Sequence, residues 1–413
     1  MKFQPSSSTR RILTIAGLVG AGAAFYGAPA QAQTAEMDAL RAQLAELQTR
    51  LDKLAVQQDA QQKTLDNAKP VVSTKTPIKI SGLLQVQLLD FFNQGGTSAA
   101  RNADTFRLRR GELRITAPKI TDKVSATVMF DPAKDTTSSR SRNNILQEIV
   151  ISYALDKRNS VDLGQFKIPV GYESLVSSSA LPFVERPLIF TTRDPFDGGY
   201  GDVRDTGIQL NSQFSKDFNL RLGVFNGVGD RQNALALSDE KAILGRLDYN
   251  GIKNLTLGVS GGVGNTGTTG TANGSTVTRR ADRNLFNLFA AYNKNKIYAA
   301  GEYLRGDAVP INFGLNTTTN APIIVNGRDI EGYYAAVGYM FAPKLQGLFR
   351  YDNFDTDRNA GNSTLKDYTL GVNYFLKGTE AKVQFNVIDH NGDSGARGFR
   401  DGTELRTAFQ ASF

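Results

Sequence analysis

Residues 77–413 alternate apolar and polar side chains in segments of about ten residues, and clusters of glycine, asparagine, aspartate and serine separate these segments. The last segment shows the pattern clearly, because Leu405 and Phe409 fall on one face while Glu404 and Arg406 fall on the other. A strand of this kind has an apolar face and a wet face. The same region contains no run of about 18 apolar residues that could form a membrane-spanning helix. The pattern therefore predicts a barrel of strands that crosses a membrane.

Sixteen such segments follow one another, and an even number allows a barrel to close with both termini in the periplasm. We predict an all-β fold over residues 77–413, a 16-stranded antiparallel transmembrane β-barrel with an aqueous lumen. Short junctions such as 118–122 alternate with long ones such as 261–280 and 306–325, as periplasmic turns alternate with extracellular loops. A soluble β-sandwich is the alternative, but it would not bury this much one-sided alternation. The predicted strands are 78–92, 104–117, 122–131, 145–155, 159–168, 203–214, 217–226, 240–249, 253–262, 281–293, 296–305, 327–341, 344–355, 366–376, 379–390 and 402–413.

Residues 1–32 have the three parts of a secretory signal peptide. The first eleven residues are basic without an acid, residues 12–28 are apolar and rich in small side chains, and Ala30-Gln31-Ala32 is a cleavage site. A transmembrane anchor is the alternative, which the many glycines and alanines and the cleavage site disfavour. Export of a cysteine-free chain that continues as a barrel predicts the outer membrane of a Gram-negative type cell.

Residues 33–69 are predicted to form a short α-helical coiled coil in the periplasm, because apolar residues recur at steps of three and four. A helix of about four heptads is marginal alone, so its apolar stripe should be buried against copies of itself. The alternative is one amphipathic helix that lies on a neighbouring surface. Lys69-Pro70 ends the pattern, and residues 70–76 are a predicted linker. The heptad positions are Met37, Leu40, Leu44, Leu47, Leu51, Leu54, Gln58, Gln61 and Leu65.

The residue types that the chain lacks exclude several classes of function. Without cysteine there is no disulfide, no cysteine zinc site and no cysteine nucleophile. His390 is the single histidine, which disfavours a histidine triad or a multi-histidine metal site. Beside Asp389 and Asn391, it is predicted to be a solvated loop residue and not the general base of a barrel phospholipase. We expect no enzyme activity, no cofactor and no metal.

The net charge is mild, at +8 for the whole chain and +5 after loss of Lys2, Arg10 and Arg11 with the signal peptide. A nucleic-acid-binding surface would need a far stronger and more clustered basic excess. We therefore expect no nucleic-acid partner.

Residues 169–202 form the one long segment that the strands leave unassigned. The segment holds four prolines and a set of large apolar residues that a solvated loop would waste. In a wide barrel such a loop can pack on the inner wall, where it would narrow the lumen and present Lys167, Arg186 and Arg193 to passing solutes. An extracellular cap or a contact between subunits is the alternative.

The alternation also predicts which charged side chains point into the lumen. Acids share the inward faces with bases, namely Glu112, Asp131, Glu148, Asp248, Asp352 and Glu404. An anion path needs an uncompensated run of cationic donors, so ion pairing on the wall is the competing explanation for these charges. The candidate pore-lining and anion-contacting residues are Lys167, Arg186 and Arg193 of the loop region and the inward Arg110, Arg114, Arg221, Arg246, Arg350, Lys382 and Arg406.

Several short stretches, in this order and spacing, resemble the phosphate-selective porins O and P. The resemblance covers essentially all of residues 77–413. Its main motifs are FRLRRGELRI at 106–115, GQFKIPVGYE at 164–173, RDTGIQ at 204–209, RYDN at 350–353 and LGVNY at 370–374.

This resemblance implies a homotrimeric outer-membrane porin with a constriction loop, an arginine ladder and a lysine-lined narrow zone that draws in anions, phosphate above all. Only Lys167 falls in a motif that matches the lysine zone. The expected function is passive diffusion of small hydrophilic solutes with an anion preference, and the expected partners are two further copies, outer-membrane lipids and permeant anions. The alternative is a structural protein whose coiled coil reaches the cell wall through residues 34–68.

Overall fold

The computed structural model describes residues 42–43, 45–54, 56–57, 76–92, 105–133, 145–191, 203–227, 241–272, 275–308, 313–315, 322–324, 328–396 and 398–413. The chain divides into two units, residues 1–73 and 74–413. In the first unit all described residues, which lie within 42–57, are helical. The signal peptide and residues 70–75 lie outside the described residues, so these boundaries and the pairing of the helix into a coiled coil stay predictions. None of the helices that the structure describes is long and apolar enough to cross a membrane.

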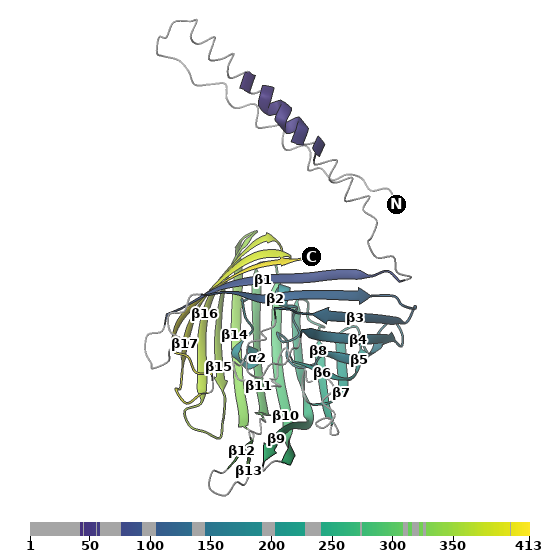
Figure 1. The fold of residues 1–413 in the computed structure, drawn as a ribbon, viewed down its shortest axis with the longest axis vertical. Helices are drawn as coiled ribbons and strands as arrows, with labels where there is room; N and C mark the ends of the chain where they lie inside the picture. The colour runs from purple at the N-terminus through teal and green to yellow at the C-terminus, as the bar shows by residue number, and fades with distance from the viewer. Residues whose placement is uncertain are drawn as a thin grey trace. The chain divides into compact units, whose positions relative to one another are not determined.

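In the second unit, sixteen of the described strands close into one antiparallel barrel, in which β1 pairs with both β2 and β18 (Figure 1). This confirms the predicted fold and the number of strands. The barrel strands are β1 Lys79–Phe92, β2 Thr105–Ala117, β3 Val124–Phe130, β4 Leu146–Ala154, β5 Asn159–Lys167, β6 Arg204–Ser212, β7 Phe218–Phe225, β8 Ala242–Tyr249, β9 Leu255–Ala272, β10 Ser275–Lys294, β11 Ile297–Ala308, β14 Arg328–Ala342, β15 Leu345–Asp355, β16 Thr364–Lys377, β17 Ala381–Gly392 and β18 Gly402–Ser412.

The predicted two-residue period is present in the burial of the side chains. Along β17, Lys382 and Gln384 point inward and are 1% and 0% exposed. The next residue, Phe385, points outward and is 40% exposed. The seam between first and last strands is held in part by the C-terminal residue, since Gly82 N donates to Phe413 O at 2.9 Å. A Cβ atom at Gly82 would lie 2.5 Å from the Phe413 ring, so this close approach requires glycine.

Two predicted loops are wrong in part. Strand β9 continues to Ala272 and β10 begins at Ser275. The two strands therefore cover most of the tract 261–280, which the sequence pattern had assigned to a loop. Glycine argues against a strand, but the threonines of this tract are β-branched and favour one, and cross-strand pairing completes the hairpin. Within the predicted loop 306–325, β12 Phe313–Leu315 and β13 Pro322–Ile324 form a separate two-stranded sheet.

The barrel has a turn end and a loop end. At the turn end, short connections such as 155–158 and 295–296 join consecutive strands. The loop end carries the long connections, among them the segment between β5 and β6. That segment contains two short helices, η2 Ser178–Ala180 and α2 Leu188–Thr191. We call its residues 168–203 the inner loop.

Candidate functional site

The described part of the inner loop lies against the inward face of the barrel wall, which is the first of the two placements left open for it. Phe183 and Val184 are 0% exposed. The backbone of the loop is hydrogen-bonded by inward side chains of four strands, because a buried backbone group needs a partner. These contacts are Leu188 N to Asp352 at 3.0 Å, Val184 N to Asn386 at 2.9 Å, Lys382 to Leu181 O at 2.6 Å, Asn373 to Pro182 O at 2.8 Å and Gln410 to Ser179 O at 2.9 Å.

The start of the loop is fixed by Glu302 of β11, which is separated from β15 in the barrel by β14 alone. Its carboxylate accepts hydrogen bonds from Tyr172 N and Glu173 N, each at 2.7 Å, and from the Tyr334 hydroxyl at 2.8 Å. Gly171 precedes these residues with a φ of 74°, and a Cβ atom there would lie 2.3 Å from the Phe190 ring. The turn therefore requires glycine at this position.

Glu173 is the least satisfied group in the loop. Its side chain is 0% exposed, and neither carboxylate oxygen has a hydrogen-bond partner among the described residues. Burial raises the pKa of Glu173 to about 7, although Arg350 and Arg186 oppose the increase. A raised pKa means that proton uptake stabilises the docked loop. This contribution is complete below the ordinary pKa of 4.5 and is lost as the pH rises through about 7.

We accordingly expect the docked loop to become less stable at alkaline pH. Ionised Glu173 costs about 3 kcal/mol in this site, so current fluctuations in planar bilayers should increase as the pH rises through neutrality. The matched variant Glu173→Gln keeps the shape without a titrating group, and its fluctuations should not change over this pH range. Equal pH dependence in both proteins would show that another group is responsible.

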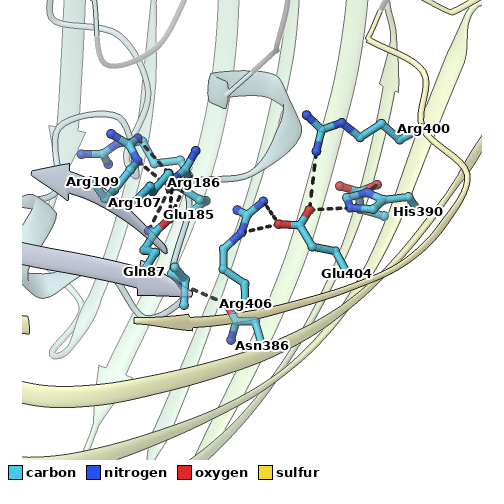
Figure 2. A network of polar contacts seen from close by, with 12 residues as sticks. Gln87, Arg107, Arg109, Glu185, Arg186, Asn386, His390, Arg400, Glu404 and Arg406 are labelled. Atoms are coloured by element: carbon cyan, nitrogen blue, oxygen red, sulfur yellow. Dashed lines mark hydrogen bonds and ion pairs between the residues drawn. The ribbon is translucent and has the colours of Figure 1, made fainter. Parts of the chain in front are cut away.

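Further along the loop, Glu185 is surrounded by arginines of β2 (Figure 2). Arg109 Nε lies 2.6 Å from one carboxylate oxygen, Arg107 Nη2 lies 3.1 Å from the same oxygen, and Arg110 Nη2 lies 3.9 Å from the other. Burial alone would raise the pKa of Glu185, but Arg109 and Arg110 outweigh it and hold the pKa well below its usual range. The carboxylate is therefore ionised over the whole physiological pH range.

Facing this cluster, a second set of charges surrounds His390 of β17 (Figure 2). Its Nδ1 lies 2.8 Å from Asp367 and its Nε2 lies 3.0 Å from Glu404, while Arg406 Nε donates to Glu404 at 2.7 Å. His390 is 3% exposed and lies within a strand, so the prediction of a solvated loop residue was wrong. The error arose because the strand extends beyond residue 390, which turns this side chain inward.

Both sets of charges line one cavity of about 360 Å³ at the loop end of the barrel. Apolar Leu89, Leu188, Phe190 and Ile388 form part of its wall. Among the described residues, seven arginines and three carboxylates line it. Two of these arginines also have acids outside the lining, since Arg350 lies 2.6 Å from Asp352 and Arg110 lies 3.7 Å from Glu112. An excess of positive charge remains, so the cavity attracts negative charge. The arginines are Arg107, Arg109, Arg110, Arg186, Arg350, Arg400 and Arg406, and the carboxylates are Glu185, Asp367 and Glu404.

A second cavity, of about 800 Å³, lies toward the turn end. Bases and acids nearly balance along its wall, and some form ion pairs, such as Arg114 with Glu148 at 2.8 Å. The larger cavity is therefore a weaker source of selectivity than the smaller one. Its bases are Arg114, Lys157, Arg158, Lys167 and Arg221, and its acids are Glu148, Asp156, Asp162 and Asp248.

Some of the predicted lumen residues hold the inner loop, some line a cavity, and Arg350 does both. Whether any of them contacts a solute stays a prediction. Arg193 lies outside the described residues. Arg246, Arg350 and Lys382 donate to backbone carbonyls of the inner loop, so they hold the loop in place. The smaller cavity is lined by Arg110, Arg186, Arg350 and Arg406, and the larger by Arg114, Lys167 and Arg221.

Sequence reasoning missed Arg107 and Arg109, which a β-bulge turns inward. The register between β1 and β2 shifts between Gln85 and Val86, so Gln85 pairs with Arg110 but Gln87 pairs with Arg107. An extra residue in one strand reverses the inside and outside positions that follow it. The adjacent charges Arg109 and Arg110 interrupt the alternation, and this interruption was the available signal. Arg400 was missed because it lies in a loop, where alternation gives no information.

Several solved structures share the fold and are distant in sequence. The anion-selective porin from Comamonas acidovorans is 13% identical, with a TM-score of 0.57 over 82% of this chain and 100% of that one. The channel DcaP of Acinetobacter baumannii is 10% identical, with a TM-score of 0.57 over 83% and 99%. OmpT of Vibrio cholerae, in its trimer form, is 11% identical, with a TM-score of 0.53 over 82% and 100%. These values show the fold alone.

The comparison with protein families identifies the family of the chain. No curated protein matches the chain significantly. The model of the phosphate-selective porins O and P, in contrast, matches residues 84–413, which is almost the whole barrel. The family match and the closed barrel both indicate a channel of the outer membrane rather than an enzyme. The chain belongs to the phosphate-selective porin O and P family.

Proposed function

We propose that this outer-membrane channel passes small hydrophilic solutes by passive diffusion and prefers anions. The observation that carries the proposal is that, among the described residues, seven arginines but three carboxylates line the cavity beside the inner loop. Lining charges select permeant ions through the field that they create in a narrow lumen, without a cofactor or a covalent step. The anion-selective porin from Comamonas acidovorans, which shares the fold, also supports a preference for anions.

Phosphate is the permeant or blocking anion that the cavity favours most. Guanidinium groups bind phosphate oxygens in bidentate pairs, and arginines from β2, β15 and β18 line this one cavity. The family name supports the assignment. The carboxylates compete for the same donors, so phosphate affinity should be moderate.

The zero-current potential of purified protein in a planar bilayer across a KCl gradient tests the anion preference. We expect a potential of the sign that chloride permeation produces, and we expect added inorganic phosphate to reduce the chloride current. A potential of the opposite sign would overturn the anion preference. A chloride current that phosphate leaves unchanged would remove phosphate from the proposal but leave the anion preference in place.

We further propose a homotrimer whose N-terminal segment lies in the periplasm and tethers the envelope. Leu47, Leu51 and Leu54 follow heptad spacing and are 56–61% exposed in the single chain, so copies of the same helix would cover them. OmpT of Vibrio cholerae, with the same fold, has a trimer form.

Deleting residues 34–68 separates the tether from the pore. A channel whose coiled coil only tethers the envelope should keep its conductance and its zero-current potential, while the protein should co-sediment less with purified cell wall. Unchanged co-sedimentation would exclude the tether. A lost current would show that the segment is part of the pore.

A further inference from the structure

Glu185 brings a negative charge from the loop into the center of the arginine cluster. Besides the three arginines of β2, Gln87 of β1 donates to its carboxylate at 3.2 Å. Gln87 in turn accepts hydrogen bonds from Arg107 at 2.9 and 2.6 Å. Glu185 therefore occupies donors that line the cavity and that would otherwise face a solute.

The loop does not need this side chain to stay on the wall. Arg350 donates to the backbone carbonyl of Glu185 at 2.9 Å, and Asn386 accepts from Val184 N at 2.9 Å. Leu188 N, on the other side of Glu185, is held by Asp352 at 3.0 Å. Because backbone contacts fix the loop on both sides of residue 185, the contribution specific to its side chain is charge.

A channel conducts an ion well only if the ion binds strongly enough to enter and weakly enough to leave. Without Glu185, the three guanidinium groups would keep Glu112, 3.7 Å from Arg110, as a counter-charge, and they would hold a multivalent anion more tightly and slow its exit. A carboxylate fixed among them neutralises part of the field and competes for the same N–H donors.

We propose that Glu185 determines selectivity as a built-in counter-ion of Arg107, Arg109 and Arg110, and that it limits how tightly the cluster holds a passing anion. The proposal deepens the proposed anion preference and rests on it. Glu185 is thus a specificity-determining residue, and its neutralisation should make the pore more selective for anions and easier to block.

The test compares wild type with Glu185→Gln, which keeps the size and the hydrogen-bonding reach of the side chain. We expect the zero-current potential across a KCl gradient to move toward the anion limit. The concentration of inorganic phosphate that halves the chloride current should fall about tenfold. The fluctuations of the KCl current should stay near those of wild type, because the backbone contacts still hold the loop.

A second variant separates charge from attachment. In Glu185→Gln with Gln87→Glu, a carboxylate returns to the cluster on β1 and not on the loop, and both readouts should return toward wild type. Gln87→Glu alone adds a second counter-charge and should move both readouts in the opposite direction. This single variant keeps the proposal testable if Glu185→Gln does not fold.

Each outcome has one meaning. If Glu185 only fastens the loop, Glu185→Gln would raise the current and its fluctuations without a change in phosphate block, and Gln87→Glu would not restore them. That result, or unchanged readouts in every variant, overturns the proposal. A cation-preferring wild type whose potential still moves toward anions in Glu185→Gln would refute the proposed anion preference but support the role of Glu185.

Discussion

Replacing Arg107, Arg109 and Arg110 together with glutamine should lower the chloride-to-potassium permeability ratio about tenfold, which corresponds to about 1.4 kcal/mol. The change removes three of the seven arginines that line the smaller cavity and leaves Glu185 without its neutralising partners. The excess of positive charge that attracts anions would nearly disappear. Zero-current potentials across a KCl gradient measure the ratio directly.

A triple variant of equal charge provides the control. Arg114, Lys157 and Arg221 line the larger cavity, where acids nearly balance the bases, and Arg114 is paired with Glu148. Their replacement by glutamine should change the permeability ratio much less. If the two triple variants shift the ratio equally, net lumen charge and not the arginine cluster determines selectivity. An unchanged ratio in the first variant would contradict the role of the cluster.

Glu302→Leu should release the start of the inner loop and widen the pore. The substitution leaves Tyr172 N, Glu173 N and the Tyr334 hydroxyl without their acceptor. Each buried donor that loses its partner costs about 1–3 kcal/mol, so the population of the released loop should increase by at least about 100-fold. The expected observation is a larger and noisier single-channel conductance.

The matched control for this substitution removes one donor to Glu302 and keeps the Glu302 carboxylate in place. Tyr334→Phe deletes one hydrogen bond to Glu302, while the two backbone hydrogen bonds to the same carboxylate remain. Its conductance should stay close to wild type. Heat-induced unfolding in detergent shows whether each barrel is intact. An intact Glu302→Leu barrel with wild-type conductance would show that Glu302 does not hold the loop.

The two-residue period predicted the barrel because every strand must place one face in lipid and one in water. The inward positions predicted for Arg350, Lys382 and Arg406 followed directly from this period, and all three side chains are buried. The apolar residues between β5 and β6 predicted a packed loop for the same reason, since exposed apolar surface is costly.

The details of the site depend on contacts that no local pattern contains. The bulge that turns Arg107 inward is a property of the pairing between β1 and β2. The use of Lys382 as a donor to Leu181 O joins residues 201 positions apart. Glu185 could not be identified as the partner of three arginines, because the path of the loop across the lumen is set by such long-range hydrogen bonds.

The central claim is that solutes cross the membrane through the arginine-lined cavity and that its field favours anions. The chain has no cysteine, so Leu89→Cys would place a single thiol in this cavity without a change in charge. Leu108→Cys provides the control, because Leu108 lies on the outer face and is 71% exposed.

The most direct test measures how fast negatively and positively charged methanethiosulfonate reagents reduce the current through the Leu89→Cys channel in a planar bilayer. We predict that both reagents reduce the current, that the negative reagent reacts several times faster, and that neither changes the current through Leu108→Cys. A Leu89→Cys current that modification does not change, or a faster reaction with the positive reagent, would contradict the account.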